Sequence, residues 1–334
     1  MNSLHEALFY KKLSDNQIQC TACNRFCLIS ENHTGYCKAR LNQKGKLYSL
    51  VYSKTLTLSV DPIEKKPLFH FKPGSQVLSI STFGCNFSCL FCQNSEMSQK
   101  MDSEIQITTP EQIISFALKN KIPGLAFTYT EPTIFVEYAL DIMKFAKKNN
   151  LFCVWVSNGF MSTELVKTIA PFLDAINIDL KGNSAFYKKM CSIDSIEPIK
   201  SNIKFFSKLK VHVEITNLII PGLNDSKKDL LELISFVKSI DPSLPVHFSA
   251  FHPNYKLTEI PVTPESTILQ AQKLALEAGL KNVFTGNLAN EQSNSFCSNC
   301  NEILISRKGY LIKIENLNSK GNCSKCGFSS KIIL

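Results

Sequence analysis

The sequence lacks three features that would indicate a membrane protein, a secreted protein or a nucleic-acid-binding protein. No stretch approaches the roughly 18 to 20 consecutive apolar residues of a membrane-spanning helix, so we expect no membrane segment. The start, MNSLHEALFYKKL, has no apolar run of the kind that directs secretion, and we expect a cytoplasmic protein. The formal charge is +9, but the 37 basic residues are spread along the chain, so nucleic-acid binding is not indicated.

The 334 residues are 44% hydrophobic, which suffices for a sizeable core. From Val77 to Phe284 the sequence repeats one unit, an apolar run suited to a buried parallel strand followed by an amphipathic stretch. Thr109-Pro110-Glu111 predicts a helix start with a cap residue, a proline and an acid, and Thr263-Pro264-Glu265 repeats it. The predicted strands are 77–81, 124–128, 152–156, 175–179, 211–219, 246–251 and 282–285.

Polar, glycine-rich or cysteine-rich segments follow almost every predicted strand, among them GCNFSCLFC, YTEPT, SNG and LKG. In a barrel of βα units the carboxyl ends of the strands share one face and form one active site. Six or seven strands therefore predict an α/β fold, a partial (β/α)6–7 TIM-like barrel with a lateral opening. We expect three parts: an N-terminal cysteine-rich β segment (1–73), the barrel (74–290) and a zinc-ribbon-like domain (291–334).

The 13 cysteines fall into three groups and two single residues, Cys153 and Cys191. Such clustering is typical of metal sites rather than of a disulfide framework, and a reducing cytoplasm keeps thiols ready for metal. Cys153 lies inside an apolar run and reads as a small buried hydrophobe. The three groups are Cys20, Cys23, Cys27 and Cys37; Cys85, Cys89 and Cys92; and Cys297, Cys300, Cys323 and Cys326.

Cys85, Cys89 and Cys92 have the spacing C-x3-C-x2-C, and no other cysteine or histidine lies within ten residues on either side. A zinc knuckle would need a fourth ligand, and a disulfide would need an oxidising compartment. Three thiolates on one loop instead suit an iron–sulfur cluster whose fourth iron is left without a protein ligand. An open iron indicates catalysis rather than electron transfer alone.

The C-terminal quartet, C-x2-C-x22-C-x2-C around the hairpin-like ILISRKGYLIKI, predicts a zinc ribbon, although the central spacing is slightly longer than usual. An iron–sulfur cluster on the same thiols is the alternative. For the N-terminal quartet, Cys20, Cys23, Cys27 and Cys37, zinc and a second iron–sulfur cluster are equally good interpretations, with unmetallated thiols third.

A C-x3-C-x2-C loop after the first strand of a βα repeat resembles the signature of radical S-adenosylmethionine (SAM) enzymes. The segments DPIEKKPLFHF, GCNFSCLFCQN, FTYTEPTIFVEY, NIDLKG and FHPNYK narrow this resemblance to the AmmeMemoRadiSam-system radical enzyme family, which is similar to pyruvate formate-lyase activating enzymes. The resemblance covers nearly the full chain. It implies a [4Fe–4S] cluster on Cys85, Cys89 and Cys92, with the amino and carboxylate groups of SAM on the unique iron.

The resemblance also implies roles for single residues. Phe91 would border the adenine and Glu131 would receive the methionine amino group, while Ser157 and Asn158 match a polar strand end near the ribose. Asp179 and Lys181 match an element near the ribose and carboxylate, and His252 matches a histidine in the same pocket. Cys191 lies where the family often has a cysteine, so a catalytic thiol is conceivable. Each residue also has a structural interpretation, as a helix-start acid, a solvated strand end or a packing histidine.

Three departures from the family patterns limit the resemblance. Tyr129 and Thr130 stand where relatives often have Gly-Gly, and Asn24-Arg25 stands where relatives commonly have Pro-His. Glycyl-radical activases usually read Asp-Thr-Asn-Gly where this chain has Val156-Ser157-Asn158-Gly159, which weakens an activase assignment.

The expected function is reductive cleavage of SAM to a 5′-deoxyadenosyl radical that takes hydrogen from a substrate. The alternatives are an activase acting on a glycine of a partner enzyme and a nucleic-acid-modifying or nucleic-acid-binding protein. Expected partners are a reductant such as ferredoxin or flavodoxin and, from the family name, Memo-like and AMMECR-type proteins. The substrate is not readable, because substrate-selecting loops carry no chemical code.

Overall fold

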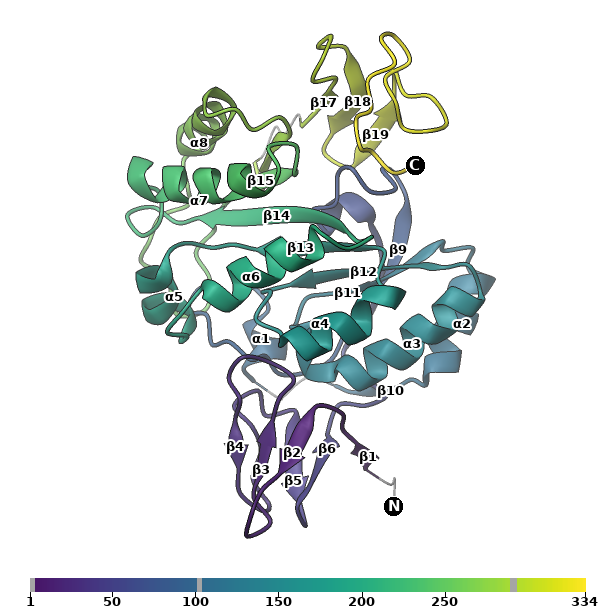
Figure 1. The fold of residues 1–334 in the computed structure, drawn as a ribbon, viewed down its shortest axis with the longest axis vertical. Coiled ribbons are helices and arrows are strands. Elements are labelled where there is room, and N and C mark those ends of the chain that lie inside the picture. The colour runs from purple at the N-terminus through teal and green to yellow at the C-terminus, as the bar shows by residue number, and fades with distance from the viewer. Residues whose placement is uncertain (1–3, 101–103, 289–292) are drawn as a thin grey trace.

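A mostly parallel sheet forms the centre of the molecule in the computed structural model, which describes residues 4–100, 104–288 and 293–334. Its strand order is β16-β15-β14-β13-β12-β11-β9-β8, so neighbours in the sequence are neighbours in the sheet (Figure 1). Only the β8–β9 pair is antiparallel. The strands are β8 (Thr57–Pro62), β9 (Gln76–Ser81), β11 (Gly124–Phe127), β12 (Phe152–Ser157), β13 (Ala175–Asp179), β14 (His212–Ile219), β15 (Val246–Ala250) and β16 (Val283–Gly286).

The seven predicted strands are confirmed, each to within one residue at either end. β8, which precedes residue 73, joins this sheet and not the N-terminal cysteine-rich sheets. In the described part of the chain no pairing joins β16 to β8, so the sheet is open and its curling into a partial barrel stays a prediction.

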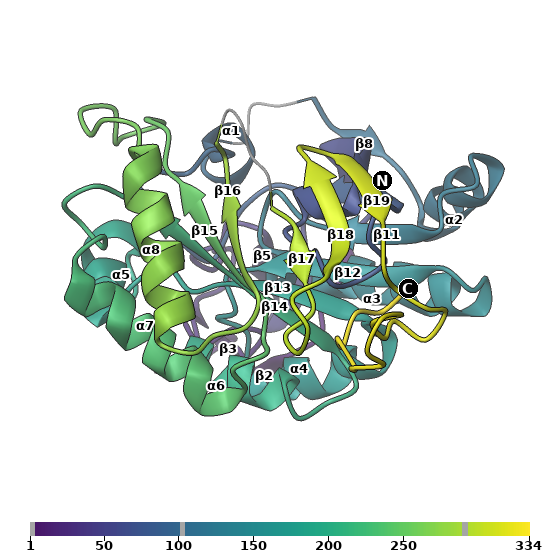
Figure 2. The same ribbon diagram turned by 90° about the horizontal axis from the view of Figure 1, so that it is seen from above.

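Helices alternate with the parallel strands and lie along one face of the sheet (Figure 2). α2 begins as predicted, with a capping box in which Thr109 and Gln112 exchange hydrogen bonds. The predicted cap of α8 is wrong in detail: the Thr263 hydroxyl binds the backbone of Phe251 and Ile219 instead, and the helix starts at Glu265. The helices are α1 (Ser95–Ser98), α2 (Pro110–Lys119), α3 (Val136–Lys148), α4 (Thr163–Ile169), α5 (Ser184–Cys191), α6 (Glu197–Phe206), α7 (Lys227–Ile240) and α8 (Glu265–Glu277). None of the described helices is long and apolar enough to cross a membrane.

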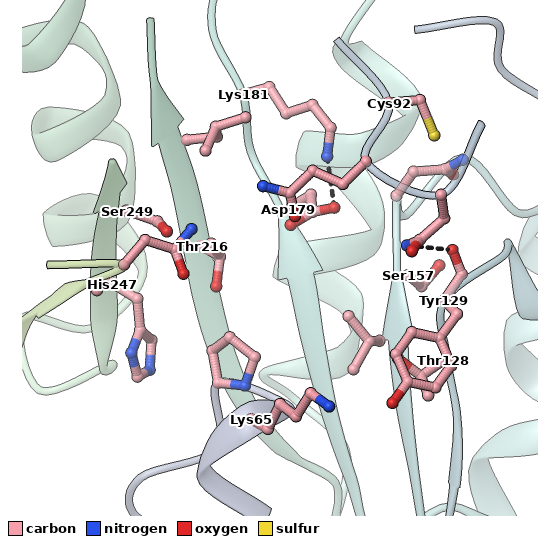
Figure 3. Close-up of a pocket in the computed structure, with 18 of the residues that line it drawn as sticks. Lys65, Cys92, Thr128, Tyr129, Ser157, Asp179, Lys181, Thr216, His247 and Ser249 are labelled. Atoms are coloured by element: carbon pink, nitrogen blue, oxygen red, sulfur yellow. Dashed lines mark hydrogen bonds and ion pairs between the residues drawn. The ribbon is translucent and has the colours of Figure 1, made fainter. Parts of the chain in front are cut away.

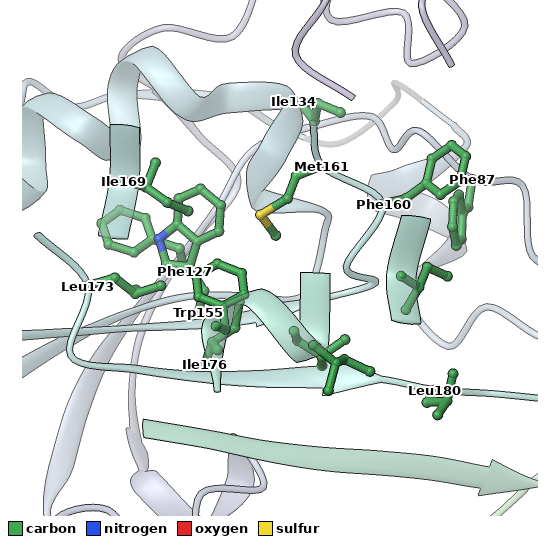
Figure 4. Packing of buried hydrophobic residues seen from close by; sticks show 14 of the residues in the cluster. Phe87, Phe127, Ile134, Trp155, Phe160, Met161, Ile169, Leu173, Ile176 and Leu180 are labelled. Atoms are coloured by element: carbon green, nitrogen blue, oxygen red, sulfur yellow. The ribbon is translucent and has the colours of Figure 1, made fainter. Parts of the chain in front are cut away.

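The two faces of the sheet pack against different partners. Phe127, Trp155 and Ile176 are register partners on neighbouring strands and pack with Ile169 and Leu173 on the helical side (Figure 4). The residues that alternate with them face the segment after β8, in a separate cluster comprising Ile63, Leu68, Phe71, Val77, Ala126, Val154 and Ala175. Residues 63–71 therefore fill part of the inner face of the sheet.

Small antiparallel sheets flank the main sheet at opposite ends (Figure 1). The C-terminal part contacts the inner segment through a parallel bridge between Phe71 and Ile333. The predicted C-terminal hairpin is present as β18 and β19. The flanking strands are β1 (His5–Glu6), β2 (Tyr10–Lys12), β3 (Ile18–Cys20), β4 (Leu28–Ile29), β5 (Arg40–Gln43), β6 (Lys46–Ser49), β7 (Lys54–Thr55), β10 (Gln106–Ile107), β17 (Ser295–Phe296), β18 (Ile303–Lys308) and β19 (Leu311–Ile314).

Candidate active site

The loop after β9 carries Cys85, Cys89 and Cys92, and all three line one cavity. Gly84, just before the first cysteine, has φ of +87°, and a Cβ there would lie 2.3 Å from the carbonyl oxygen of Cys37. Only glycine fits, because a side chain would meet backbone and the conformation is left-handed. The start of the loop is thus fitted tightly to the N-terminal segment.

The cavity has a volume of about 840 Å³, within the range of small-molecule sites. Its lining comes from the parallel strands or the loops that follow them, from residues 64–69 and from the turn at residues 308–310 between β18 and β19. Cys92 and Lys181 lie at one end, while Lys65 and His247 lie at the other (Figure 3). The C-terminal part therefore helps to wall the same cavity as the cysteine loop.

Glu131 is buried at the cavity wall and its carboxylate is already partly used. Its Oε1 accepts hydrogen bonds from the Thr133 hydroxyl (2.6 Å), the Thr133 amide (3.1 Å) and the Ser157 hydroxyl (2.8 Å). Its Oε2 accepts one, from the Asn158 amide at 2.8 Å. Burial raises the pKa of Glu131, and these hydrogen bonds oppose that rise. Oε2 retains room for a further donor, such as a ligand ammonium.

Asp179 and Lys181 form an ion pair beside the cysteine loop, with Lys181 Nζ donating to Asp179 Oδ2. Burial favours the neutral lysine, but the Asp179 carboxylate outweighs it and raises the pKa of Lys181, so the ammonium is retained at neutral pH. The Tyr187 hydroxyl ties the two residues together. It accepts from the Lys181 amide at 2.9 Å and donates to the Asp179 carbonyl at 3.0 Å.

Asn158, Phe91 and His252 complete the predicted cofactor residues. Asn158 and Phe91 line the cavity, and Asn158 Nδ2 donates to Asn86 Oδ1 at 2.7 Å in the cysteine loop. His252 is exposed, is not among the lining residues, and lies 3.2 Å from the Asn287 carbonyl oxygen. Six of the seven predicted cofactor residues therefore meet at one cavity, and His252 does not.

Cys191 ends α5 and is fully buried against the cysteine loop. The Leu90 amide donates to the Met190 carbonyl at 3.0 Å, and the neighbouring Cys191 thiol raises the pKa of Cys89. The residue does not line the cavity. Its place favours a role in supporting the loop over direct contact with a substrate.

Asp61, Lys65, Lys66 and Tyr129 form a network at the end of the cavity away from the cysteines, and the sequence analysis assigned them no role. Both lysine ammoniums lie 2.8 Å from the Asp61 carboxylate, and the Tyr129 hydroxyl donates to it at 2.5 Å. Burial opposes ionisation of Asp61, but the two lysines outweigh it and lower its pKa. Tyr129 has φ of +65°, at one of the positions where relatives often have glycine.

Glu214 is a second unforeseen charge, fully buried in β14. Its carboxylate accepts from the amides of Phe69 (3.0 Å) and His70 (2.7 Å) and lies 2.9 Å from His212 Nε2 and 2.6 Å from His247 Nε2. A glutamate within the apolar run VHVEITNLI was the only sequence signal for it. Glu214 thus fixes the inner segment to β14 and holds His247, which lines the cavity.

The C-terminal quartet forms a compact cluster, as predicted. The Sγ atoms of Cys297 and Cys326 are 3.6 Å apart, those of Cys300 and Cys323 are 3.7 Å apart, and all four lie within 4.8 Å of one another. Zn–S bonds of about 2.3 Å in a tetrahedron place sulfur atoms about 3.8 Å apart, so the spacing fits one four-coordinate ion.

The sequence profile of the radical SAM superfamily matches residues 79–237, which include the cysteine loop, Glu131 and the Asp179–Lys181 pair. An uncharacterized protein of Methanocaldococcus jannaschii is 45% identical over 99% of this chain and 100% of its own length. Another protein of that archaeon, named provisionally as a glycyl-radical enzyme activating enzyme, is 24% identical over 61% of this chain and 78% of its own. Residues 79–237 of the chain belong to the radical SAM superfamily.

The crystal structure of SuiB from Streptococcus suis bound to S-adenosylmethionine matches with a TM-score of 0.52 and 12% identity. The match covers 68% of this chain and 53% of SuiB, and shows a shared fold. Membership of the superfamily implies a [4Fe–4S] cluster and SAM. The residues present fit both groups. The three loop thiols line the same cavity as the Glu131 carboxylate and the Lys181 ammonium. Apart from these thiols, His247 is the one cysteine or histidine side chain among the described residues that line the cavity.

Proposed function

We propose that this protein is a radical SAM enzyme that uses a [4Fe–4S] cluster on Cys85, Cys89 and Cys92 to cleave SAM. When bound, these groups supply methionine and a 5′-deoxyadenosyl radical that abstracts hydrogen from a substrate. The observation that carries the proposal is that the three thiols, Glu131 and Lys181 line one cavity.

Different residues around the loop would recognise different parts of SAM. The free acceptor site on Glu131 Oε2 suits an N–H of the methionine amino group, and Lys181 suits the carboxylate. Asp179 would offer an acceptor to a ribose hydroxyl, and Phe91, which is buried beside the loop, would border the adenine. Asn158 fixes the loop to the end of β12 through Asn86. These contacts orient the cofactor before the reaction begins.

The opposite end of the cavity is the candidate substrate chamber. Lys65, Tyr129 and His247 line it together with Ser249 and Thr285, and the family resemblance assigns none of these side chains to the cofactor. We favour a polar small molecule or a single side chain as the substrate.

The test is anaerobic reconstitution with iron and sulfide, reduction, and measurement of 5′-deoxyadenosine from SAM. The wild-type protein is expected to form it even without substrate, by uncoupled turnover. Cys92→Ala is expected to form none, whereas Cys153→Ala, at a buried cysteine on β12 away from the cavity, is expected to match the wild type. Absence of 5′-deoxyadenosine from the reconstituted wild type would refute the proposal.

A glycyl-radical activase acting on a partner protein is the second candidate, supported by similarity to the archaeal protein named for that activity. Val156, which lines the cavity, stands where activases usually have a carboxylate, and this favours another reaction. Transfer of deuterium from a labelled backbone glycine of a co-purified protein into 5′-deoxyadenosine would support the activase function.

Other components of the proposed system follow from the family resemblance. A ferredoxin or flavodoxin would supply the electron, and Memo-like and AMMECR-type proteins are proposed partners. Zinc is proposed for the C-terminal quartet, whose sulfur spacing supports a single ion. A metal centre is proposed for the N-terminal quartet as well.

A further inference from the structure

The four N-terminal cysteines come together although they lie on different turns. Cys20 ends β3, Cys37 lies before β5, and Cys23 and Cys27 lie on the turn between β3 and β4. All four line a single small cavity. Convergence of four thiols in a segment that forms no disulfide indicates a metal centre.

Arg40 brings a buried guanidinium, paired with Glu137, to the same cavity. Its side chain is 2% exposed and lines the same cavity, close enough to Cys20 and Cys37 for direct electrostatic interaction. Nη2 binds Glu137 and the Leu8 carbonyl, but Nε and Nη1 have no hydrogen-bond partner among the described residues. Burying unpaired guanidinium donors is costly unless an anionic group meets them. A metal bound by four thiolates is such an anion.

The spacing of the thiols separates zinc from an iron–sulfur cluster. A zinc ion holds its four sulfur atoms about 3.8 Å apart, as the C-terminal quartet nearly has them. In the part of the chain that the structure describes, that quartet is the only group of three or more metal-type side chains whose ligand atoms all lie within 4.8 Å. No three of the N-terminal thiols are that close.

Cys85, Cys89 and Cys92, which superfamily membership assigns to a [4Fe–4S] cluster, are also spaced more widely than that limit. Thiolates around a cubane are far apart because each binds a different iron. Among the described residues, the C-terminal quartet thus has the sulfur spacing of a single zinc ion, and neither the loop trio nor the N-terminal quartet has it.

The N-terminal quartet also lies directly against the cysteine loop. The Cys37 carbonyl is the atom that a side chain at Gly84 would strike, and Arg25 Nε donates to the Asn86 carbonyl. Arg25 in turn stacks on Tyr36, with 3.6 Å from its guanidinium carbon to the ring centroid. A metal at this position would fix the N-terminal segment against the loop.

We propose that Cys20, Cys23, Cys27 and Cys37 bind a second [4Fe–4S] cluster, with the Arg40 guanidinium as its buried counter-charge. This site is separate from the SAM cavity and does not depend on radical chemistry.

The experiment counts metals in the full-length protein after anaerobic reconstitution. The wild type is expected to hold about eight irons and one zinc per chain, and the triple variant C85A/C89A/C92A about four irons and one zinc. Reduction of the triple variant should give the electron paramagnetic resonance signal of a reduced [4Fe–4S] cluster. Adding C23S and C27S to the triple variant should abolish both the iron and the signal.

Two matched variants exclude other locations for that iron. Adding C153A to the triple variant should leave about four irons, and adding C300S and C326S should remove zinc while keeping them. Two zinc ions and only about four irons in the wild type would overturn the proposal, as would about two irons or none in the triple variant. The iron and zinc content of the wild type is measured without any substitution. It can therefore refute the proposal even if a variant fails to fold. Normal 5′-deoxyadenosine formation with two zinc ions would overturn this inference alone.

Discussion

Glu214→Gln removes the charge that joins the inner segment to β14, and its effect on stability can be worked from the contacts. The carboxylate accepts four hydrogen bonds, two on each oxygen, and each oxygen receives one backbone amide and one imidazole. In either orientation of the glutamine side chain, its NH2 group takes the place of one carboxylate oxygen and so faces one backbone amide and one imidazole. An imidazole can switch tautomer and accept, but a backbone amide cannot, so the Phe69 or His70 amide is left unpaired.

A buried unpaired donor costs about 1 to 3 kcal/mol, and the remaining bonds lose their charge assistance. We expect the free energy of unfolding to fall by roughly 2 to 4 kcal/mol at neutral pH, measured by urea denaturation with circular dichroism. The control Glu277→Gln, on the exposed side of α8, should change it by less than about 0.5 kcal/mol. A change below that value for Glu214→Gln would refute the reasoning.

The pH dependence of this effect has a definite sign. Burial alone would raise the pKa of Glu214, but the hydrogen bonds from His212 and His247 outweigh it and hold that pKa well below its usual value. The pKa of Glu214 is lower in the folded state than in the unfolded chain, where it is about 4.3. The ionised carboxylate therefore stabilises the folded protein above about pH 4.3, and this stabilisation is lost as the pH falls further. The gap between wild type and variant should narrow as the pH falls below about 4. A gap that widens in acid would contradict the assignment.

Three further substitutions test other parts of the structure. Lys181→Met leaves the Asp179 carboxylate unpaired and should lower 5′-deoxyadenosine formation by about tenfold or more, whereas Lys200→Met, on an outer helix, should leave it within twofold. Arg40→Met leaves the buried Glu137 carboxylate without its ion-pair partner. The free energy of unfolding in urea should fall by about 3 to 5 kcal/mol, and a smaller loss would contradict burial of the pair. Cys300→Ser should release the C-terminal metal, raising amide hydrogen exchange in β18 and β19; unchanged exchange would show that the hairpin needs no metal.

The main sheet and the cysteine loop were predictable because their signals are local. Apolar runs such as FCVWV and AINID mark buried parallel strands, and the C-x3-C-x2-C spacing lies within one loop. Glu131 and Lys181 were identified through family motifs, and the structure brings both to the cavity that the loop cysteines line.

The inner network was not predictable, because its partners are distant in the sequence. Asp61 meets Tyr129 across 68 residues, and His247 meets Glu214 across 33, so no window of sequence contains either pair. Thr263 shows the reverse case. The local sequence predicts that its hydroxyl caps α8, but the hydroxyl instead bonds the backbone of Phe251 and Ile219. The sequence also left the metal of the N-terminal quartet open, since zinc and iron–sulfur sites share cysteine spacings and differ in sulfur separation.

The central claim is that the loop cysteines would hold a [4Fe–4S] cluster in the cavity and that SAM would bind beside it through its amino and carboxylate groups. Electron–nuclear double resonance on the reduced, reconstituted protein with SAM labelled at those two groups with ¹⁵N and ¹³C tests it directly. We predict hyperfine coupling from both labels in the wild type and in Cys153→Ala. A reduced cluster that shows no coupling to either label in the presence of saturating SAM would contradict the account.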